Sequence, residues 1–125
     1  MDPKTAAAAY KTASIENAPG IKIVRMLYEG ALRFIDRART EGPSVPAFGT
    51  WVSRADEIVV ELRCALRAEH GEELCTDLER LYLFVEDRLG SAMRDRVTAP
   101  LDEAHQILQT LLEAWRQVEV TCEAK

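Results

Sequence analysis

The segment Ile21–Ala38, which reads IKIVRMLYEGALRFIDRA, has the pattern of a long amphipathic helix around which the rest of the chain is organised. Its apolar residues recur at spacings of three and four, the period that places side chains on one face of an α-helix. This apolar stripe consists of Val24, Leu27, Tyr28, Ala31, Phe34, Ile35 and Ala38. A helix with a single apolar stripe gains most of its stability by packing that stripe against partners. We therefore expect the rest of the chain to supply those partners.

Two further segments repeat this pattern after a loop rich in glycine and proline at residues 42–49. The second helix is expected to begin near Thr50 or Trp51, or at Ser53 as an N-cap, and to end near Gly71. The third helix follows at once and ends near Arg94. The apolar stripes are Val52, Ala55, Ile58, Val59, Leu62 and Leu66 in the second helix, and Leu74, Leu78, Leu81, Tyr82, Val85, Leu89 and Ala92 in the third.

A fourth helix is predicted to open at Thr98 as an N-cap, with Pro100 in its first turn, and to run to about Val118. Its stripe comprises Leu101, Ala104, Leu108, Leu111, Trp115 and Val118. No segment has the pattern of a strand. The sequence thus predicts an all-α protein, an antiparallel up-down four-helix bundle at residues 21–118, with a short N-terminal segment or small helix at 1–20 and a C-terminal tail at 119–125.

Length, charge and cysteine content exclude several classes of protein. The chain has 125 residues, enough for one domain, and its net charge of -5 argues against nucleic-acid binding. No apolar run approaches the roughly 20 residues of a membrane span, and the N-terminus lacks the apolar core of a secretory signal. Cys64, Cys75 and Cys122 form no Cys-x-x-Cys pair, so we expect reduced thiols in a cytoplasmic protein.

The sequence gives no positive sign of catalysis. The tetrapeptide Asp102–His105 matches a helicase signature, but the chain has no phosphate-binding glycine-rich loop after a strand. Asp102 and His105 are three residues apart, whereas a di-metal bundle needs paired Glu-x-x-His motifs and further inward carboxylates. We therefore predict that the protein is not an enzyme, with no catalytic residue, metal or cofactor.

Each helix has more large apolar residues than its stripe needs. The surplus residues are Ile23 and Met26 in the first helix, Val52 and Val60 in the second, Leu83 and Phe84 in the third, and Ile107 and Leu112 in the fourth. Wide faces are expected where every helix packs against two neighbours, and this explains most of the surplus. The alternative is that part of it stays exposed as a groove for a partner helix.

The order of the motifs resembles the FliS family of flagellin export chaperones. Residues 26–34 read MLYEGALRF, close to the family's Met-Leu-Tyr-Asp-Gly-Ala-Ile-x-Phe. Supporting matches are Tyr10, residues 54–62, the Leu78-x-x-Leu81-Tyr82 motif, and the closing Leu111-x-x-x-Trp115. The resemblance covers nearly the whole chain, from Tyr10 to Trp115.

The resemblance implies a cytoplasmic bacterial chaperone that holds newly made flagellin. In such proteins the disordered C-terminal segment of flagellin becomes helical in apolar grooves of the bundle. Binding keeps flagellin from polymerising early and helps present it to a component of the flagellar export gate. The N-terminal segment of the family can cover part of the groove until the client displaces it. Here that role would fall to Tyr10, with Ile15.

We predict that the partner-binding residues are Val52, Val60, Leu78, Leu81, Leu83 and Phe84, with Tyr10 and Ile15 as the covering residues. Tyr28 and Trp115 are expected in the core. A second hypothesis, of a different class, is a structural bundle that self-associates through its wide apolar faces. A metal-dependent bundle enzyme is a distant third.

Overall fold

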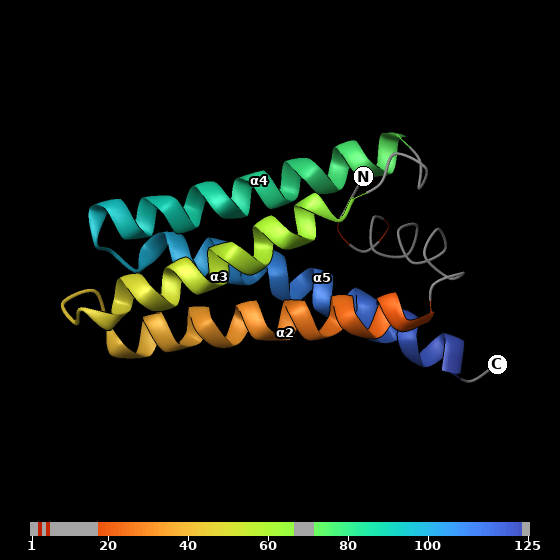
Figure 1. The fold of residues 1–125 in the computed structure, drawn as a ribbon, viewed down its shortest axis with the longest axis horizontal. Helices are drawn as coiled ribbons and strands as arrows, with labels where there is room; N and C mark the ends of the chain where they lie inside the picture. Colours follow the sequence, from red (N-terminus) through yellow and green to blue (C-terminus); the bar gives the residue numbers. More distant parts are fainter. Residues whose placement is uncertain (1–2, 4, 6–17, 67–71, 124–125) are drawn as a thin grey trace.

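The computed structural model describes residues 3, 5, 18–66 and 72–123 of the chain. Its helices, labelled as in Figure 1, are α2 (Ala18–Glu41), α3 (Ala47–Cys64), α4 (Glu72–Asp95) and α5 (Ala99–Glu123). Consecutive helices pack side by side, and α2 packs against α5 to close the ring. The described residues contain no strand. The prediction of an all-α helical bundle is confirmed.

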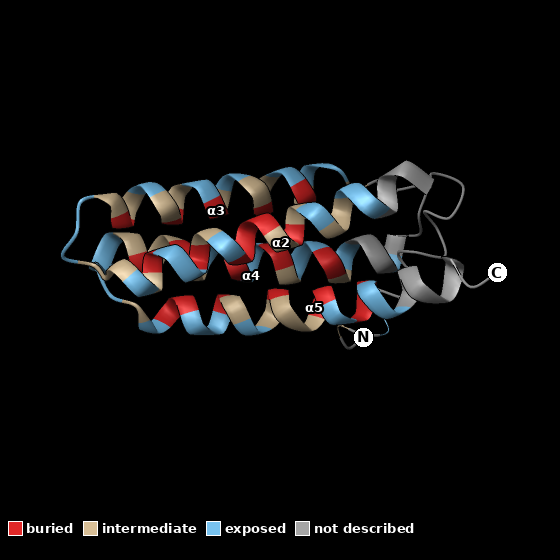
Figure 2. Ribbon diagram, turned by 90° about the horizontal axis from the view of Figure 1, so that it is seen from below, coloured by how far each residue is buried: buried red, intermediate tan, exposed pale blue. Residues whose placement is uncertain are grey.

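The apolar stripes meet along the axis of the bundle, where Figure 2 shows the buried residues facing inward. Tyr28 is 0% exposed and Trp115 is 1% exposed, so both core predictions are confirmed. The other large side chains that are wholly buried include Tyr82, Phe48, Ile35, Leu78, Leu89, Leu101, Leu108 and Leu111. Leu112, a surplus residue by sequence pattern, is also buried, because α5 packs against both α4 and α2.

The start of α3 differs from the prediction. The helix begins at Ala47, with Pro46 at the N-cap position and no side-chain capping hydrogen bond. The φ angle of Pro46, -55°, already suits a helix, which favours this early start. Phe48 then enters the core. The predicted N-cap Ser53 is inside the helix, where its hydroxyl donates to the Sδ of Met93 at 3.4 Å.

Three other helix ends also differ from the prediction. α3 ends at Cys64, before the predicted end near Gly71, which lies outside the described residues. α2 starts at Ala18 rather than Ile21, because Pro19 is tolerated in a first helical turn. α5 continues past Val118 to Glu123. The division into an N-terminal segment, a bundle and a tail otherwise remains a prediction.

The turn between α4 and α5 contacts the start of α3. Arg96 has a φ of 53°, and the amide of Val97 donates to the carbonyl of Ala92 at 3.2 Å, which terminates α4. The Arg96 guanidinium lies over the ring of Phe48, 5.4 Å from its centroid. This contact ties the start of α3 to the end of α4.

None of the helices within the described ranges combines the length and apolar character that a membrane crossing requires.

Candidate partner-binding surface

The residues predicted to bind a partner have very different exposures. Val52 and Leu78 are 0% exposed, which corrects the expectation that they line an open groove. Both residues belong to the apolar stripes of their helices, and these stripes pack into the core. Val60 and Leu81 are half-buried. Tyr10 and Ile15 lie outside the described residues.

Val60 and Leu83 flank the seam between α3 and α4. Two contacts mark this seam: the Ser53–Met93 hydrogen bond and the ion pair of Arg63 with Glu86 at 2.6 Å. Val60 follows Ser53 by two helical turns and so lies on the α4-facing side of α3. Leu83 precedes Glu86 by three residues, is on the α3-facing flank of α4, and is 46% exposed.

Phe84 lies on the opposite flank of α4. It is 42% exposed, and the guanidinium of Arg88 sits 5.6 Å from the centroid of its ring. Arg88 also approaches Glu103 of α5 at 3.8 Å, which places this flank against α5. Leu83 and Phe84 are adjacent in sequence but belong to different seams, because successive helical residues are about 100° apart. The structure therefore does not gather the predicted residues into one groove.

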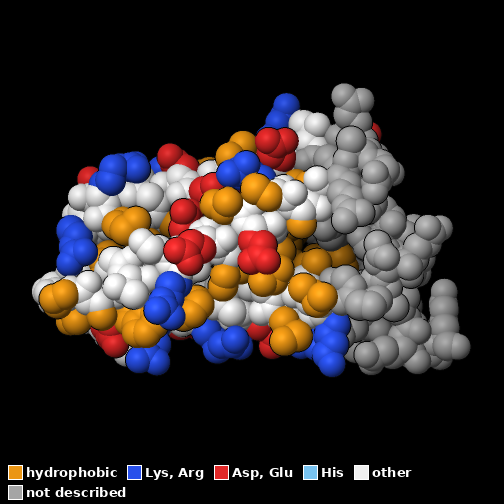
Figure 3. Space-filling view, viewed as in Figure 1, with side chains coloured by type: hydrophobic (Ala, Val, Ile, Leu, Met, Phe, Trp, Pro, Cys, Tyr) orange, Lys and Arg blue, Asp and Glu red, His pale blue; other side chains and the backbone are white. Residues whose placement is uncertain are grey.

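The seam between α2 and α3 carries an apolar strip that the predicted site did not include. Ile23 and Met26 are 54% and 55% exposed. The strip continues to Gly30, where an added Cβ would lie 3.4 Å from the Cδ1 of Ile58. Figure 3 shows the face that carries α3, on which apolar side chains are interspersed with charged ones. The sequence signal was present in the helical spacing of Ile23, Met26, Gly30 and Phe34.

An aromatic stack extends this strip toward the α2–α3 loop. The rings of Phe34 and Trp51 are 5.8 Å apart with an interplanar angle of 15°. The Nε1 of Trp51 donates to a carboxylate oxygen of Glu41 at 2.6 Å. Arg37 lies over the Trp51 ring at 4.5 Å, and Arg54 lies 6.0 Å from Phe34 and 5.8 Å from Trp51. Sequence reasoning missed this cluster because its members are spread over two helices.

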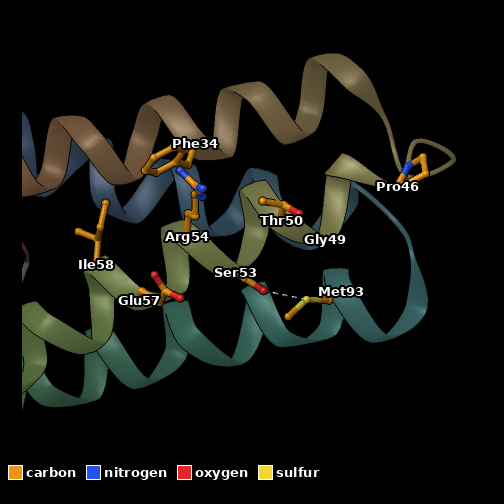
Figure 4. A pocket seen from close by; sticks show the side chains of 9 residues that line it. All are labelled: Phe34, Pro46, Gly49, Thr50, Ser53, Arg54, Glu57, Ile58 and Met93. Atoms are coloured by element: carbon orange, nitrogen blue, oxygen red, sulfur yellow. Dashed lines mark hydrogen bonds between the residues drawn. The ribbon is translucent and has the colours of Figure 1, made fainter.

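An open pocket of about 750 Å³ adjoins the stack on the outer side of α3 (Figure 4). Arg54 extends toward Phe34 at one side of it, while Ser53 points to Met93 at the other. The remaining lining residues are Pro46, Gly49, Thr50, Glu57 and Ile58. Apolar and polar groups alternate around it, so the pocket suits a side chain of a protein partner better than a wholly apolar ligand.

The α3–α4 seam also holds a cluster of charges. Both Nε and Nη2 of Arg63 donate to the carboxylate of Glu86, at 2.6 and 3.2 Å. Burial raises the pKa of Asp56 above its ordinary value, and the nearby negative charge of Glu86 raises this pKa further. The ionised form of Asp56 is therefore disfavoured in the folded protein, although Arg63 partly offsets this effect.

The residues of the helicase-like tetrapeptide are engaged with α2. The carboxylate of Asp102 accepts a hydrogen bond from Arg39 at 3.0 Å, and the Nε2 of His105 lies 3.3 Å from Asp36. These contacts join α2 to α5 at the surface of the bundle. Within the described part of the chain, no three His, Cys, Asp or Glu side chains are grouped so as to hold a metal ion.

Comparison with known proteins identifies a family and several relatives of this chain. Residues 3–121 match the family model described as flagellar protein FliS. A flagellar secretion chaperone FliS of Vibrio cholerae is 30% identical over 116 residues, covering 88% of this chain and 85% of the relative. The protein of the same name in Campylobacter jejuni is 34% identical over 109 residues, covering 82% and 85%. The resemblance seen in the sequence is thus confirmed, and the chain belongs to the FliS family.

Proposed function

We propose that this protein is a flagellar secretion chaperone that binds the disordered C-terminal segment of flagellin. The observation that carries the proposal is the family match over residues 3–121, together with relatives that are named flagellar secretion chaperones. In this proposal the protein acts in the cytoplasm and binds without catalysis. It keeps flagellin from polymerising and delivers it to a component of the flagellar export gate.

The distribution of apolar side chains supports a client that folds on binding. Such clients typically bury about 1,000–3,000 Å² and lose about 2–5 kcal/mol to ordering, more than one small pocket can offset. The bundle instead offers exposed apolar side chains along several seams. Ile23 and Met26 lie on α2, and Leu83 and Phe84 lie on α4, so an extended client can contact separate faces as it wraps around the bundle.

The contact residues in this proposal are those that remain accessible. They are Val60, Leu81, Leu83 and Phe84 from the predicted set, with Ile23 and Met26 added by the structure. Val52 and Leu78 support the surface from within the core. Tyr10 and Ile15 are proposed to cover part of the surface before the client arrives.

Titration with a peptide from the C-terminal end of the flagellin of the same cell tests the proposal. Circular dichroism should show a saturable gain of helicity with a defined stoichiometry, because the peptide orders on the bundle. A peptide of the same composition in scrambled order is the control and should produce no gain. Equal responses to both peptides, or no response to either, would contradict the proposal.

The exposed side chains of Ile23 and Met26 also favour a second candidate, self-association of the bundle through this face. Sedimentation velocity at several protein concentrations, with and without flagellin, separates the two functions. A chaperone forms a stoichiometric complex with its client. A structural oligomer increases in size as its own concentration rises, and its sedimentation does not change when flagellin is added.

A further inference from the structure

Guanidinium groups gather around the Phe34–Trp51 stack on the outside of α2 and α3. Arg37 and Arg54 lie against the aromatic rings, within 4.5 to 6.0 Å of their centroids. The Nη2 of Arg33 lies 3.8 Å from the position of a Cβ on Gly30, and the Cδ1 of Ile58 approaches that same position at 3.4 Å. Arg33 therefore extends over the α2–α3 seam, next to a side chain that lines the pocket.

The positive charges of this cluster are poorly balanced. Arg37 approaches Glu41 at 4.0 Å, and Glu41 already accepts the hydrogen bond from Trp51. Arg33 and Arg54 make no ion pair with any acidic residue in the described ranges. This local surplus of cations stands on a chain whose net charge is -5. The aromatic rings hold Arg37 and Arg54 in place, so less side-chain freedom is lost when either one binds an anion.

We propose that this Arg33–Arg37–Arg54 cluster, together with the adjoining pocket, docks an acidic segment of a second protein. Carboxylates of that segment pair with Arg33 and Arg54, for which bidentate hydrogen bonding is the favoured geometry. A neighbouring apolar side chain of the segment enters the pocket beside Ile58. Binding hot spots are enriched in Trp and Arg side chains that surround a pocket, as they do here. The inference is independent of the proposed binding of flagellin.

The surroundings favour an acidic protein segment over a nucleic acid. Glu57 lines the pocket and Glu41 lies beside Trp51, so a continuous row of phosphates would meet negative charge on both sides. A protein segment can place its carboxylates on the arginines and an apolar or hydroxyl group near Glu57. The apolar contacts with Phe34, Ile58 and Met93 suit such a mixed segment.

The test uses the intrinsic fluorescence of Trp51 in the full-length protein. Trp51 is half-buried, while Trp115 is 1% exposed, so a ligand at this surface perturbs mainly Trp51. The probes are a synthetic amphipathic peptide with glutamate and leucine on opposite faces, its counterpart with lysine in place of glutamate, and a short DNA duplex. We expect saturable binding of the glutamate peptide alone, weakened by added salt.

Charge variants locate the binding site. The Arg33→Gln/Arg54→Gln variant should bind the glutamate peptide about tenfold more weakly or worse, a loss of roughly 1.4 kcal/mol. Arg80→Gln/Arg94→Gln is the control, because it removes two exposed α4 cations and the same total charge. Equal weakening in the two double variants, binding of the lysine peptide, or preference for the duplex would overturn the inference. So would no saturable binding of the glutamate peptide. Titration of each variant with the flagellin peptide tests the proposed function separately.

Discussion

The hydroxyl oxygens of Tyr28 and Tyr82 lie 2.5 Å apart in the core and share a hydrogen bond. The two residues are on α2 and α4, which face each other diagonally across the ring of helices, each flanked by α3 and α5. Their rings are tilted by 42° with centroids 6.4 Å apart. Long aromatic side chains from opposite helices thus meet at the bundle axis, each ending in a polar group that the other satisfies.

The tyrosine pair should behave as a coupled unit. Tyr28→Phe and Tyr82→Phe should each lower the free energy of unfolding by about 0.5–1.5 kcal/mol, the net value of a buried hydrogen bond. The double variant should lose less than the sum of the single losses, because each single change already breaks the shared bond. Urea denaturation of the four proteins gives the coupling energy. Additive losses would show that the two hydroxyls do not interact in solution.

Two helical glycines should respond in opposite directions. Gly30 lies under Ile58, so Gly30→Val should destabilise the protein by about 1–3 kcal/mol through overpacking at the α2–α3 seam. A Cβ on Gly90 meets only the guanidinium of Arg94, a flexible side-chain end that can move aside. Gly90→Ala should therefore stabilise α4 by up to about 1 kcal/mol.

Thermal melts and urea titrations measure both glycine effects on the same scale. Gly30→Ala is the matched intermediate, since it adds a Cβ at 3.4 Å from Ile58 but no branch. Because Ala also has a higher helix propensity than Gly, Gly30→Ala should be more stable than Gly30→Val, and the difference between these two variants reports the packing against Ile58. A stabilised Gly30→Val variant would show that α2 and α3 are less closely packed than the structure has them.

Substitutions in the α2–α3 and α3–α4 seams test which seam contacts the flagellin peptide. Leu83→Asp and Met26→Asp should leave the fold intact, because both side chains are about half exposed. Each should weaken binding roughly tenfold if its seam contacts the client, a loss of about 1.4 kcal/mol. Val97→Asp is the control, since Val97 is 41% exposed in the α4–α5 turn, away from both seams. Normal binding by Leu83→Asp would remove the α3–α4 seam from the client site.

Stability at the α3–α4 seam should depend on pH through Asp56. Its pKa is raised above 3.8 in the folded state, so the folded protein binds this proton more tightly than the unfolded chain. The resulting destabilisation is complete above the raised pKa and disappears as the pH falls below 3.8. Asp56→Asn should accordingly raise the denaturation midpoint at neutral pH and lose this advantage in acid. Glu61→Gln, an exposed α3 residue whose charge does not shift the pKa of Asp56, is the control; an equal gain there would contradict the assignment.

Removal of the N-terminal segment tests whether it covers the client surface. If Tyr10 and Ile15 cover apolar groups, deletion of residues 1–17 should increase the binding of a hydrophobic dye. The deletion should also speed association with the flagellin peptide, because the client no longer has to displace the segment. Unchanged dye binding and association rates would indicate that the segment has no covering role.

The strongest sequence patterns predicted the bundle well. Residues with three- and four-residue spacing, such as Tyr28, Leu89 and Trp115, are buried as expected. The sequence pattern predicts too late a start for α3, because Gly49 and Pro46 are typical of a loop. In the folded chain, burial of Phe48 outweighs the low helix propensity of Gly49, and local propensity carries no information about that tertiary contact.

The candidate site was harder to predict than the fold. Sequence period gives the angle of a residue around its own helix, and from this angle alone Leu112 and Leu83 both count as surplus. Only the arrangement of neighbours decides that Leu112 is buried and Leu83 is exposed. The same holds for the Phe34–Trp51 stack, whose members come from different helices.

The helical class, the core stripes and the family are thus predictable from the sequence, because they depend on local spacing and on the order of motifs. The tertiary structure is needed to show which apolar residues remain outside the core and which charges meet at the seams. Those outcomes depend on which helix packs on each flank, and that choice follows from the free energy of the whole bundle rather than of any single segment.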